Sequence, residues 1–482
     1  MLRFLIFLEL TLLLLFSANA QVFDMVVDAQ GSGGYQTIQS AIDAVSNNKS
    51  DRTLILVLNG KYSEKILVPS SKVNVSLIGE SQEGVIITWN DYAGSETGLS
   101  SAATATLQVD AKDFYMENVT VQNTAGRVGQ ALAIRTVGDR GVYKNCSFVG
   151  FQDTYYAHKA RQYNYQCYVE GGVDFIYGDA TAVFDECTVN CVSGGSYITA
   201  PADTKLYSRL SSGDKFYNGL MILRSEVTCN TDVSANSYYL GRPWQPDASS
   251  VFILCKLGNH IKSEGWHPGG DGNNLSGYYA EYQNTDLDGE TIDVSQRVDW
   301  SHQITDEWFQ NYYKLDYFFK KDGVIWEAKT MTKALLTPEN LRVDGTLIRW
   351  DATDQAIGYV VFYNNSFVAI TEAPSILADG MEIENVEVKS VRDNGVLSDP
   401  SNKNLLVGNN EFQLVEAPDV WFNNKTIYSS ENIQLTIYSV NGVVLKSYKQ
   451  VRQQSLSELP HGAYILKATN SKGKKIVQKF ML

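Results

Sequence analysis

Several signatures that would identify a reaction directly are missing from this chain of 482 residues. It contains no G-x-S-x-G elbow, no H-E-x-x-H pair and no P-loop. Of its five histidines, none neighbours a candidate nucleophile, and His267 in Gly265-Trp266-His267-Pro268 is interpreted as structural. The six cysteines include no C-x-x-C pair, so a zinc site is not expected. These absences disfavour serine-hydrolase and zinc chemistry and leave carboxylates to carry a reaction.

Positive charge is also scarce. Forty Lys and Arg residues face 54 Asp and Glu residues, which gives a net charge of −14, so nucleic acid is not an expected partner. Residues 1–20 contain Arg3, a leucine-rich stretch and Ala18-Asn19-Ala20, which predicts a secretory signal peptide. No later segment is long and apolar enough to be a membrane-spanning segment. The chain is therefore expected to be secreted or held at the cell surface after passage through the periplasm.

The chain after the signal peptide divides into three expected parts. Residues 21–330 combine an amphipathic helix at 35–45 with short β runs, such as 53–58 and 73–78, that continue to about residue 283. An aromatic-rich helix at 305–319 is expected to pack back on these strands. Residues 335–405 resemble a fibronectin type III domain, with several short strands around one core tryptophan.

The last part, residues 406–482, resembles the C-terminal sorting domain read by the bacterial type IX secretion machinery. It contains the run 435–438 followed by Asn441-Gly442, which is a strong hairpin-turn signal. The alternative is one more β-sandwich without an address function. We expect the chain after about residue 335 to be dispensable for catalysis and the last ~70–80 residues to be needed for export.

An irregular repeat in the first part is the most informative feature. Asp153 and Asp174 are each the seventh residue after a cysteine, and they lie 21 residues apart. Turns of this length predict an all-β, parallel solenoid in which equivalent residues stack at roughly 4.8 Å. When two carboxylates lie at such a short distance, their repulsion raises the pKa of one of them, as in acid/base pairs. The alternative, a structural polar ladder, is disfavoured because the charges repel.

The same repeat places Cys146, Cys167 and Cys187 in one phase. They should form a column in the solenoid. Buried thiols and a bridge between Cys167 and Cys187 both remain open at this point.

Six sequence blocks in register resemble the signature blocks of pectin methylesterases, over roughly residues 24–320. The family has a right-handed parallel β-helix, here followed by two small β-sandwich modules. It acts on methylated homogalacturonan without a metal or other cofactor. The blocks are 28–38, 60–64, 129–135, Gly150-Phe151-Gln152-Asp153-Thr154-Tyr155-Tyr156, Gly172-Val173-Asp174-Phe175-Ile176-Tyr177-Gly178 and Leu240-Gly241-Arg242-Pro243-Trp244.

The resemblance implies catalytic roles for five residues. Asp174 is the nucleophile, kept ionised by Arg242. Gln130 and Gln152 donate to the oxyanion, and Asp153 is the proton donor and acceptor.

The same resemblance implies that Tyr156, Tyr177 and Trp244 bind the sugar rings. The enzyme is expected to act as a monomer. Two rival functions remain: a galacturonase or lyase on the same solenoid, which would cut the polysaccharide chain, and a non-catalytic pectin-binding surface protein.

Overall fold

The computed structural model describes residues 22–31, 34–203, 207–209, 215–268, 276–401, 420–423, 426–439, 444–460, 463–470 and 475–481. The predicted signal peptide at 1–20 lies outside these residues. The chain divides into two compact units, residues 1–406 and 407–482. Each unit is described separately below.

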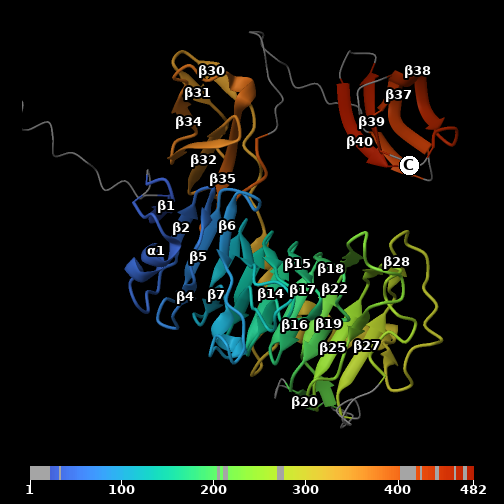
Figure 1. The fold of residues 1–482 in the computed structure, drawn as a ribbon. Helices are drawn as coiled ribbons and strands as arrows, with labels where there is room; N and C mark the ends of the chain where they lie inside the picture. Colours follow the sequence, from blue (N-terminus) through green and yellow to red (C-terminus); the bar gives the residue numbers. More distant parts are fainter. Residues whose placement is uncertain are drawn as a thin grey trace, which may run out of the picture. The chain divides into compact units, whose positions relative to one another are not determined.

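The first unit is built on a parallel β-helix (Figure 1), which confirms the predicted fold class. Three parallel sheets run along it, and most successive turns of the chain add one strand to each sheet. Within the described residues the first sheet has eleven strands: β1 (Met25–Val27), β2 (Thr53–Val57), β5 (Val75–Gly79), β8 (Tyr115–Glu117), β11 (Gly141–Lys144), β14 (Arg161–Tyr165), β17 (Thr181–Asp185), β22 (Leu220–Leu223), β25 (Ser249–Ile253), β27 (Tyr278–Tyr282) and β29 (His302–Gln303).

The second and third sheets complete each turn. In the described part of the chain the second has nine strands: β3 (Gly60–Tyr62), β6 (Val85–Trp89), β9 (Thr120–Asn123), β12 (Ser147–Val149), β15 (Tyr168–Gly171), β18 (Thr188–Cys191), β23 (Glu226–Cys229), β26 (Lys256–Leu257) and β28 (Thr285–Asp286). The third has seven there: β4 (Ile66–Val68), β7 (Leu107–Val109), β10 (Ile134–Thr136), β13 (Tyr155–Ala157), β16 (Val173–Gly178), β19 (Tyr197–Pro201) and β24 (Tyr239–Gly241). A hairpin of β20 (Tyr207–Arg209) and β21 (Lys215–Tyr217) follows β19.

The turn between the first and second sheets explains the repeat seen in the sequence. From β8 onward, one residue in each of seven successive turns adopts a left-handed backbone, with φ between 46° and 57°. Polar side chains, Asn above all, tolerate this conformation best. The next residue points into the buried core, where Cys146, Cys167 and Cys187 lie one above another as free thiols. The left-handed residues are Asn118, Asn145, Gln166, Glu186, Arg224, Leu254 and Gln283.

Helix α1 (Ile38–Ala44) closes the interior of the β-helix at its N-terminal end (Figure 1). Thr37 caps the helix, since its hydroxyl accepts from the Ser40 N–H at 3.2 Å. Ile38, Ala41 and Ile42 are buried among the inward-facing strand residues. A helix is therefore present within the predicted range 35–45, but it begins only at Ile38, because Tyr35 bridges to Val27 and Thr37 is extended.

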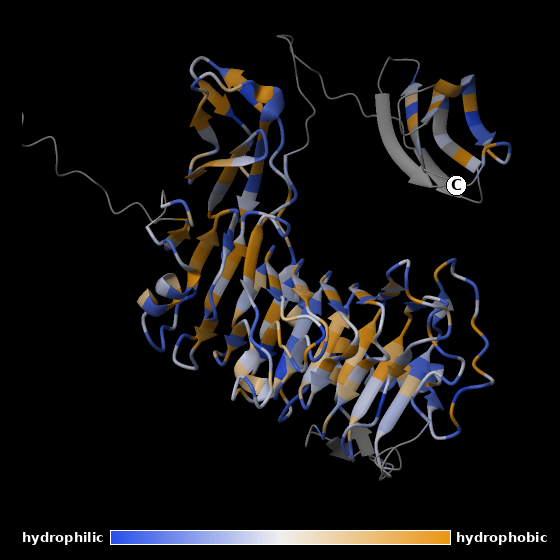
Figure 2. Cartoon of the chain, viewed as in Figure 1, coloured by the Kyte–Doolittle hydropathy of each residue, from blue (hydrophilic) through white to orange (hydrophobic). Residues whose placement is uncertain are grey.

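The outer face of the first sheet is apolar and covered. Figure 2 shows hydrophobic residues along its strands. The cover comes from α2 (Asp306–Tyr312), α3 (Leu315–Phe318) and the 3-10 helix η3 (Ala328–Thr332). The single helix predicted at 305–319 is wrong in detail, because Lys314 is extended (φ −71°, ψ 145°) and separates two helices. The break allows Tyr313 and Phe318 both to be buried.

The small β module after residue 335 also contributes to this cover. It pairs two sheets of three strands each in its described residues, β30 (Arg342–Asp344), β31 (Leu347–Arg349) and β34 (Ser375–Leu377) against β33 (Ser366–Thr371), β32 (Gly358–Tyr363) and β35 (Val386–Val391), with the 3-10 helix η4 (Ile383–Asn385). Trp350 is buried in its core, as predicted. Val360, Phe362 and Val391 share a second core with Leu54 and Ile78 of the β-helix.

Polar contacts reinforce this docking of the module on the β-helix. The Ser76 hydroxyl donates to the Asn394 carbonyl at 2.7 Å in a buried position, and the Phe367 N–H donates to Glu80 at 3.1 Å. The module is thus a packed part of the first unit. No helix in the described part of the chain has the length and apolarity to span a membrane.

The second unit is an antiparallel sheet around its own small core of Ile433, Leu435, Ile437 and Leu466. The predicted hairpin turn at Asn441-Gly442 lies outside the described residues. The strands are β36 (Val420–Asn423), β37 (Thr426–Ser439), β38 (Val444–Ser455), β39 (Ala463–Asn470) and β40 (Lys475–Met481).

Candidate active site

Asp153 and Asp174 occupy equivalent places on neighbouring turns of the third sheet. The register pairs Tyr155 with Ile176 and Tyr156 with Tyr177, and the same 21-residue offset relates the two aspartates. The Asp153 N–H donates to the Val173 carbonyl at 3.0 Å. Both residues are buried, with relative exposures of 8% for Asp153 and 5% for Asp174. The structure therefore brings them together as the spacing predicts.

Both aspartates have a left-handed backbone, with φ of 64° at Asp153 and 49° at Asp174. A non-glycine residue in this region costs of order 1–3 kcal/mol and persists where the surrounding structure enforces it. Here Asp153 lies two residues before β13 and Asp174 is the second residue of β16, so the paired strands hold both residues in this conformation. In this backbone conformation, the side chains of Asp153 and Asp174 lie on the same surface of the β-helix.

The two carboxylates have opposite electrostatic surroundings. Arg242 forms a bidentate ion pair with Asp174, with Nε–Oδ1 at 2.8 Å and Nη2–Oδ2 at 2.6 Å, which favours the ionised carboxylate. Burial, and then the charge of Asp174, raise the pKa of Asp153 from 3.8 to about 7. Below neutral pH Asp153 is therefore protonated, while Asp174 lies in the ion pair with Arg242.

Ser101 is a site residue that the sequence analysis missed. It begins the 3-10 helix η1 (Ser101–Thr104), and its hydroxyl donates to Asp153 Oδ2 at 3.3 Å. The Tyr177 hydroxyl lies 3.3 Å from the same Ser101 oxygen. Both hydroxyls lower the pKa of Asp153 against the larger effect of burial. Ser101 lies 52 residues before Asp153 in a loop outside the repeat, so no spacing pointed to it.

Gln152 is the residue before Asp153, and Gln130 precedes Ala131 on the neighbouring turn. Gln152 bridges to Val173, the residue before Asp174, and its carbonyl accepts from the N–H of Ala131 at 3.0 Å. Both glutamine side chains are half-buried. Neither amide hydrogen-bonds another group in the described part of the chain. Two uncharged donors thus remain for a ligand.

The three predicted aromatic residues form one cluster but differ in access. The Tyr156 and Tyr177 rings stack at 4.3 Å between centroids, and Trp244 meets Tyr177 edge-on at 5.8 Å. Trp244 is 37% exposed and Tyr156 is half-buried, whereas Tyr177 is 5% exposed. Tyr177 therefore supports Tyr156 and Ser101 and offers little surface to a sugar.

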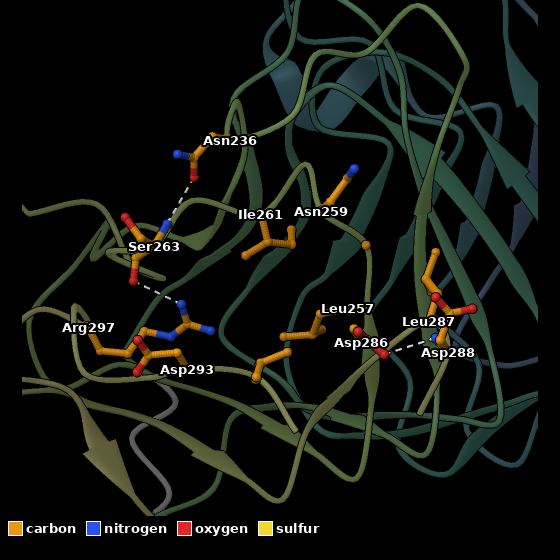
Figure 3. Close-up of a pocket in the computed structure, with 12 residues that line it drawn as sticks. Asn236, Leu257, Asn259, Ile261, Ser263, Asp286, Leu287, Asp288, Asp293 and Arg297 are labelled. Atoms are coloured by element: carbon orange, nitrogen blue, oxygen red, sulfur yellow. Dashed lines mark hydrogen bonds between the residues drawn. The ribbon is translucent and has the colours of Figure 1, made fainter. Parts of the chain in front are cut away.

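His267 packs edge-on against Tyr197 and Tyr239, with ring centroids at 5.4 and 5.3 Å. The described residues include no cluster of three or more His, Cys, Asp or Glu side chains that could hold a metal. A separate cavity of about 500 Å³ lies near Leu257, Asp286 and Arg297 (Figure 3). None of the predicted site residues lines it, so it is distinct from the carboxylate site.

Comparison with known proteins identifies both parts of the chain. Residues 24–322 match the family model described as Pectinesterase, and residues 422–482 match the one described as Secretion system C-terminal sorting domain. Pectinesterase 31 of Arabidopsis thaliana is 36% identical over 291 residues, which are 58% of this chain and 87% of the relative. Another relative from that plant, probable pectinesterase/pectinesterase inhibitor 64, is 35% identical, and the match spans 57% of this chain and 47% of that protein.

Solved structures agree with the sequence matches. Pectin methylesterase from carrot has a TM-score of 0.56 and 29% identity, over 62% of this chain and 93% of that one. Pectin methylesterase PemA from Erwinia chrysanthemi has a TM-score of 0.52 and 28% identity, over 62% and 97%. A pectin methylesterase solved in complex with a hexasaccharide gives 0.51 and 28%, with the same coverage.

Proposed function

This chain belongs to the pectinesterase family, and from that premise we propose that it hydrolyses the methyl esters of homogalacturonan with Asp174 as nucleophile and Asp153 as acid and base. The products are pectate and methanol. The observation that carries the residue roles is the pair of buried, in-register carboxylates, of which one is ion-paired to Arg242 and the other has a raised pKa.

The first step is attack by an Asp174 carboxylate oxygen on the ester carbonyl carbon. Arg242 aims the carboxylate through its two hydrogen bonds. The carbonyl oxygen becomes an oxyanion, which accepts from the amides of Gln130 and Gln152. The C–O bond to methanol then breaks, and protonated Asp153 donates its proton to the departing oxygen. A mixed anhydride between Asp174 and galacturonate remains.

The second step reverses the proton transfer. Ionised Asp153 takes a proton from water while the water oxygen attacks the galacturonate acyl carbon. The anhydride breaks, Asp174 leaves as a carboxylate, and the proton stays on Asp153 for the next cycle. A group that must both give and accept a proton works best with a pKa near the working pH, and the pKa of Asp153 is raised to about 7.

Two aromatic rings are suited to hold the sugars over the reacting pair. Trp244 and Tyr156 keep accessible surface in the same cluster, and aromatic faces pack well against the C–H faces of sugars. Tyr177 and Ser101 position the Asp153 carboxyl from behind. The chain is proposed to act as a monomer.

The C-terminal part places this activity outside the cell. The sorting domain at 422–482 belongs to the type IX export route, which delivers proteins to the cell surface or the medium. A polymeric substrate such as pectin is accessible there.

Methanol release separates this function from its rivals. Purified chain is incubated with highly methylated homogalacturonan, with and without EDTA, and both methanol and chain length are measured. Methanol without shorter chains supports the esterase. Shorter or unsaturated chains would indicate a galacturonase or lyase, and binding without methanol would indicate a non-catalytic surface protein.

A further inference from the structure

The six cysteines fall into two groups that differ in what their sulfur atoms contact. Four occupy the core-facing position after the left-handed residue of a turn, and each thiol donates to a backbone carbonyl of the preceding turn at 3.3 to 3.6 Å. Ser225 occupies the same position, and its hydroxyl donates to the Phe184 carbonyl at 3.1 Å. This position therefore selects a small side chain that can donate a hydrogen bond. The four cysteines of this column are Cys146, Cys167, Cys187 and Cys255.

Cys191 and Cys229 lie outside this column and directly opposite each other. They are the last residues of β18 and β23, and the parallel register pairs them. Both side chains face the interior, since Cys191 belongs to the buried core and Cys229 packs against it. Neither thiol makes a hydrogen bond within the ranges that the structure describes. Neighbouring strands lie about 4.8 Å apart, which is within the roughly 4.4–6.8 Å between Cα atoms that a disulfide requires.

Hydrogen bonds on the outer face fix the register at this point. The Thr228 hydroxyl donates to Asn190 Oδ1 at 3.0 Å, and the Asn190 amide donates to Asn230 Oδ1 at 2.8 Å. The Asn230 N–H also donates to the Cys191 carbonyl at 3.0 Å. The residues on both sides of Cys229 are thus bonded to Asn190 or Cys191. These bonds keep the two cysteines opposite each other.

The surroundings leave room for the two sulfur atoms to approach. On the other side of Cys191 the register places Gly171, which has no side chain. On the other side of β23, strand β26 pairs only with Glu226 and Val227, so the end of β23 has no partner strand there among the described residues. Cys229 is half-buried, whereas Cys191 is fully buried. A reagent from the surface therefore reaches Cys229 first.

We propose that Cys191 and Cys229 are joined in a disulfide as the chain is exported. The sorting domain at 422–482 belongs to an export route, and disulfides form and persist in the oxidising periplasm and outside the cell. The oxidant is a protein disulfide of the class carried by thiol–disulfide oxidoreductases.

Two exchange steps balance the reaction. The Cys229 thiolate attacks one sulfur of the oxidant's disulfide, and the other sulfur leaves as a thiolate. The Cys191 thiolate then attacks the Cys229 sulfur, and the oxidant's first sulfur leaves in turn. The chain loses two protons and two electrons in total, and the oxidant's disulfide is reduced to two thiols.

The link restrains a segment that packs beside the active site. The Val192 N–H donates to the Gly171 carbonyl at 3.1 Å, and the Ser196 N–H donates to the Gly172 carbonyl at 2.8 Å. Gly171 and Gly172 lead directly into β16, the strand of the proposed nucleophile. A disulfide at Cys191 therefore stabilises the chain next to this strand against local unfolding.

The linkage is measured on the full chain recovered after export. Free thiols are alkylated without reduction, the protein is digested, and fragmentation of the peptides by mass spectrometry identifies the linked cysteines. We expect a peptide pair joined through Cys191 and Cys229, and we expect it to be absent when the chain is made in a reducing cytoplasm. Alkylated Cys191 and Cys229 in the exported chain, or a link from either one to another cysteine, would overturn the proposal.

Thermal unfolding provides a second measurement. Cys229→Ala should lower the Tm of the exported chain by several degrees, and a reducing agent should abolish this difference from wild type. Cys255→Ala is the matched control, because the Cys255 thiol donates to the Ile222 carbonyl at 3.3 Å and Ser225 occupies the equivalent position on the preceding turn. Any change in the Tm of the control should survive reduction. A Tm difference for Cys229→Ala that persists after reduction, or no difference before it, would contradict the disulfide.

Discussion

Replacing Ser101 with alanine should move the alkaline limb of the pH–rate profile upward. The Ser101 hydroxyl donates to Asp153 Oδ2 and so stabilises the ionised carboxylate. Without this hydrogen bond, the protonated form of Asp153 persists to higher pH. The first chemical step needs that protonated form, so kcat/KM should be retained further into alkaline solution.

The size of the effect follows from the geometry. A hydrogen bond to a charged group contributes about 1.5–3 kcal/mol. The hydrogen bond from Ser101 to Asp153 is long, at 3.3 Å, so we expect it to contribute less, about 1 kcal/mol. Since one pKa unit corresponds to about 1.4 kcal/mol, the limb should rise by about 0.7 pH unit. The starting point is the raised pKa of Asp153 at about 7. Tyr177→Phe should shift the limb in the same direction, because its hydroxyl also lowers the pKa of Asp153.

The assay is methanol release at limiting substrate from pH 5 to 9, with Ser100→Ala as the control. Ser100 is exposed, and its side chain makes no cap hydrogen bond to η1. Its profile should match that of wild type. An alkaline limb that stays in place in Ser101→Ala, or moves to lower pH, would refute the assignment of this limb to Asp153.

Three further predictions concern the pH dependence of stability, the effect of EDTA and the effect of truncating the chain. The rise of the Asp153 pKa from 3.8 to about 7 means that the folded state holds the proton more tightly, so stability is lost as pH rises through this range. Asp153→Asn should therefore stabilise the protein by about 3 kcal/mol more at pH 8 than at pH 5, visible as a larger gain in Tm. EDTA should leave methanol release unchanged, and a loss that calcium restores would revive the lyase. Ending the chain after residue 332 uncovers Leu54 and Ile78, which the β module buries. This truncation should lower Tm and promote aggregation, whereas ending it after residue 406 should not, and equal Tm values would contradict the shared core.

The sequence was informative where the repeat dictates geometry. The equal distance of Asp153 and Asp174 from their cysteines placed both on one sheet, because a parallel ladder keeps equivalent residues in register. The helix at 35–45 was visible from its apolar spacing alone.

The sequence did not reveal the features that depend on the path of a loop or on the packing of the β module against the β-helix. Ser101 reaches Asp153 through a loop without periodicity. Tyr177 lies three residues after Asp174, as Tyr156 does after Asp153, yet the Ser101 contact and the ring stacking bury it. Leu54 and Ile78 belong to ordinary strand patterns, which do not reveal what covers the outward face. The sequence predicted that the β module is dispensable for catalysis. It did not reveal that the module packs against the β-helix.

The central claim is that Asp174 attacks the ester, and the most direct measurement is methanol release by Asp174→Asn. The substitution preserves the size of the side chain but removes its nucleophilicity and its repulsion of Asp153. The variant should have the circular dichroism spectrum of the wild type and an unchanged or higher Tm. Its kcat should be at least about 1,000-fold lower. Retention of near-normal turnover by this folded variant would contradict the mechanism.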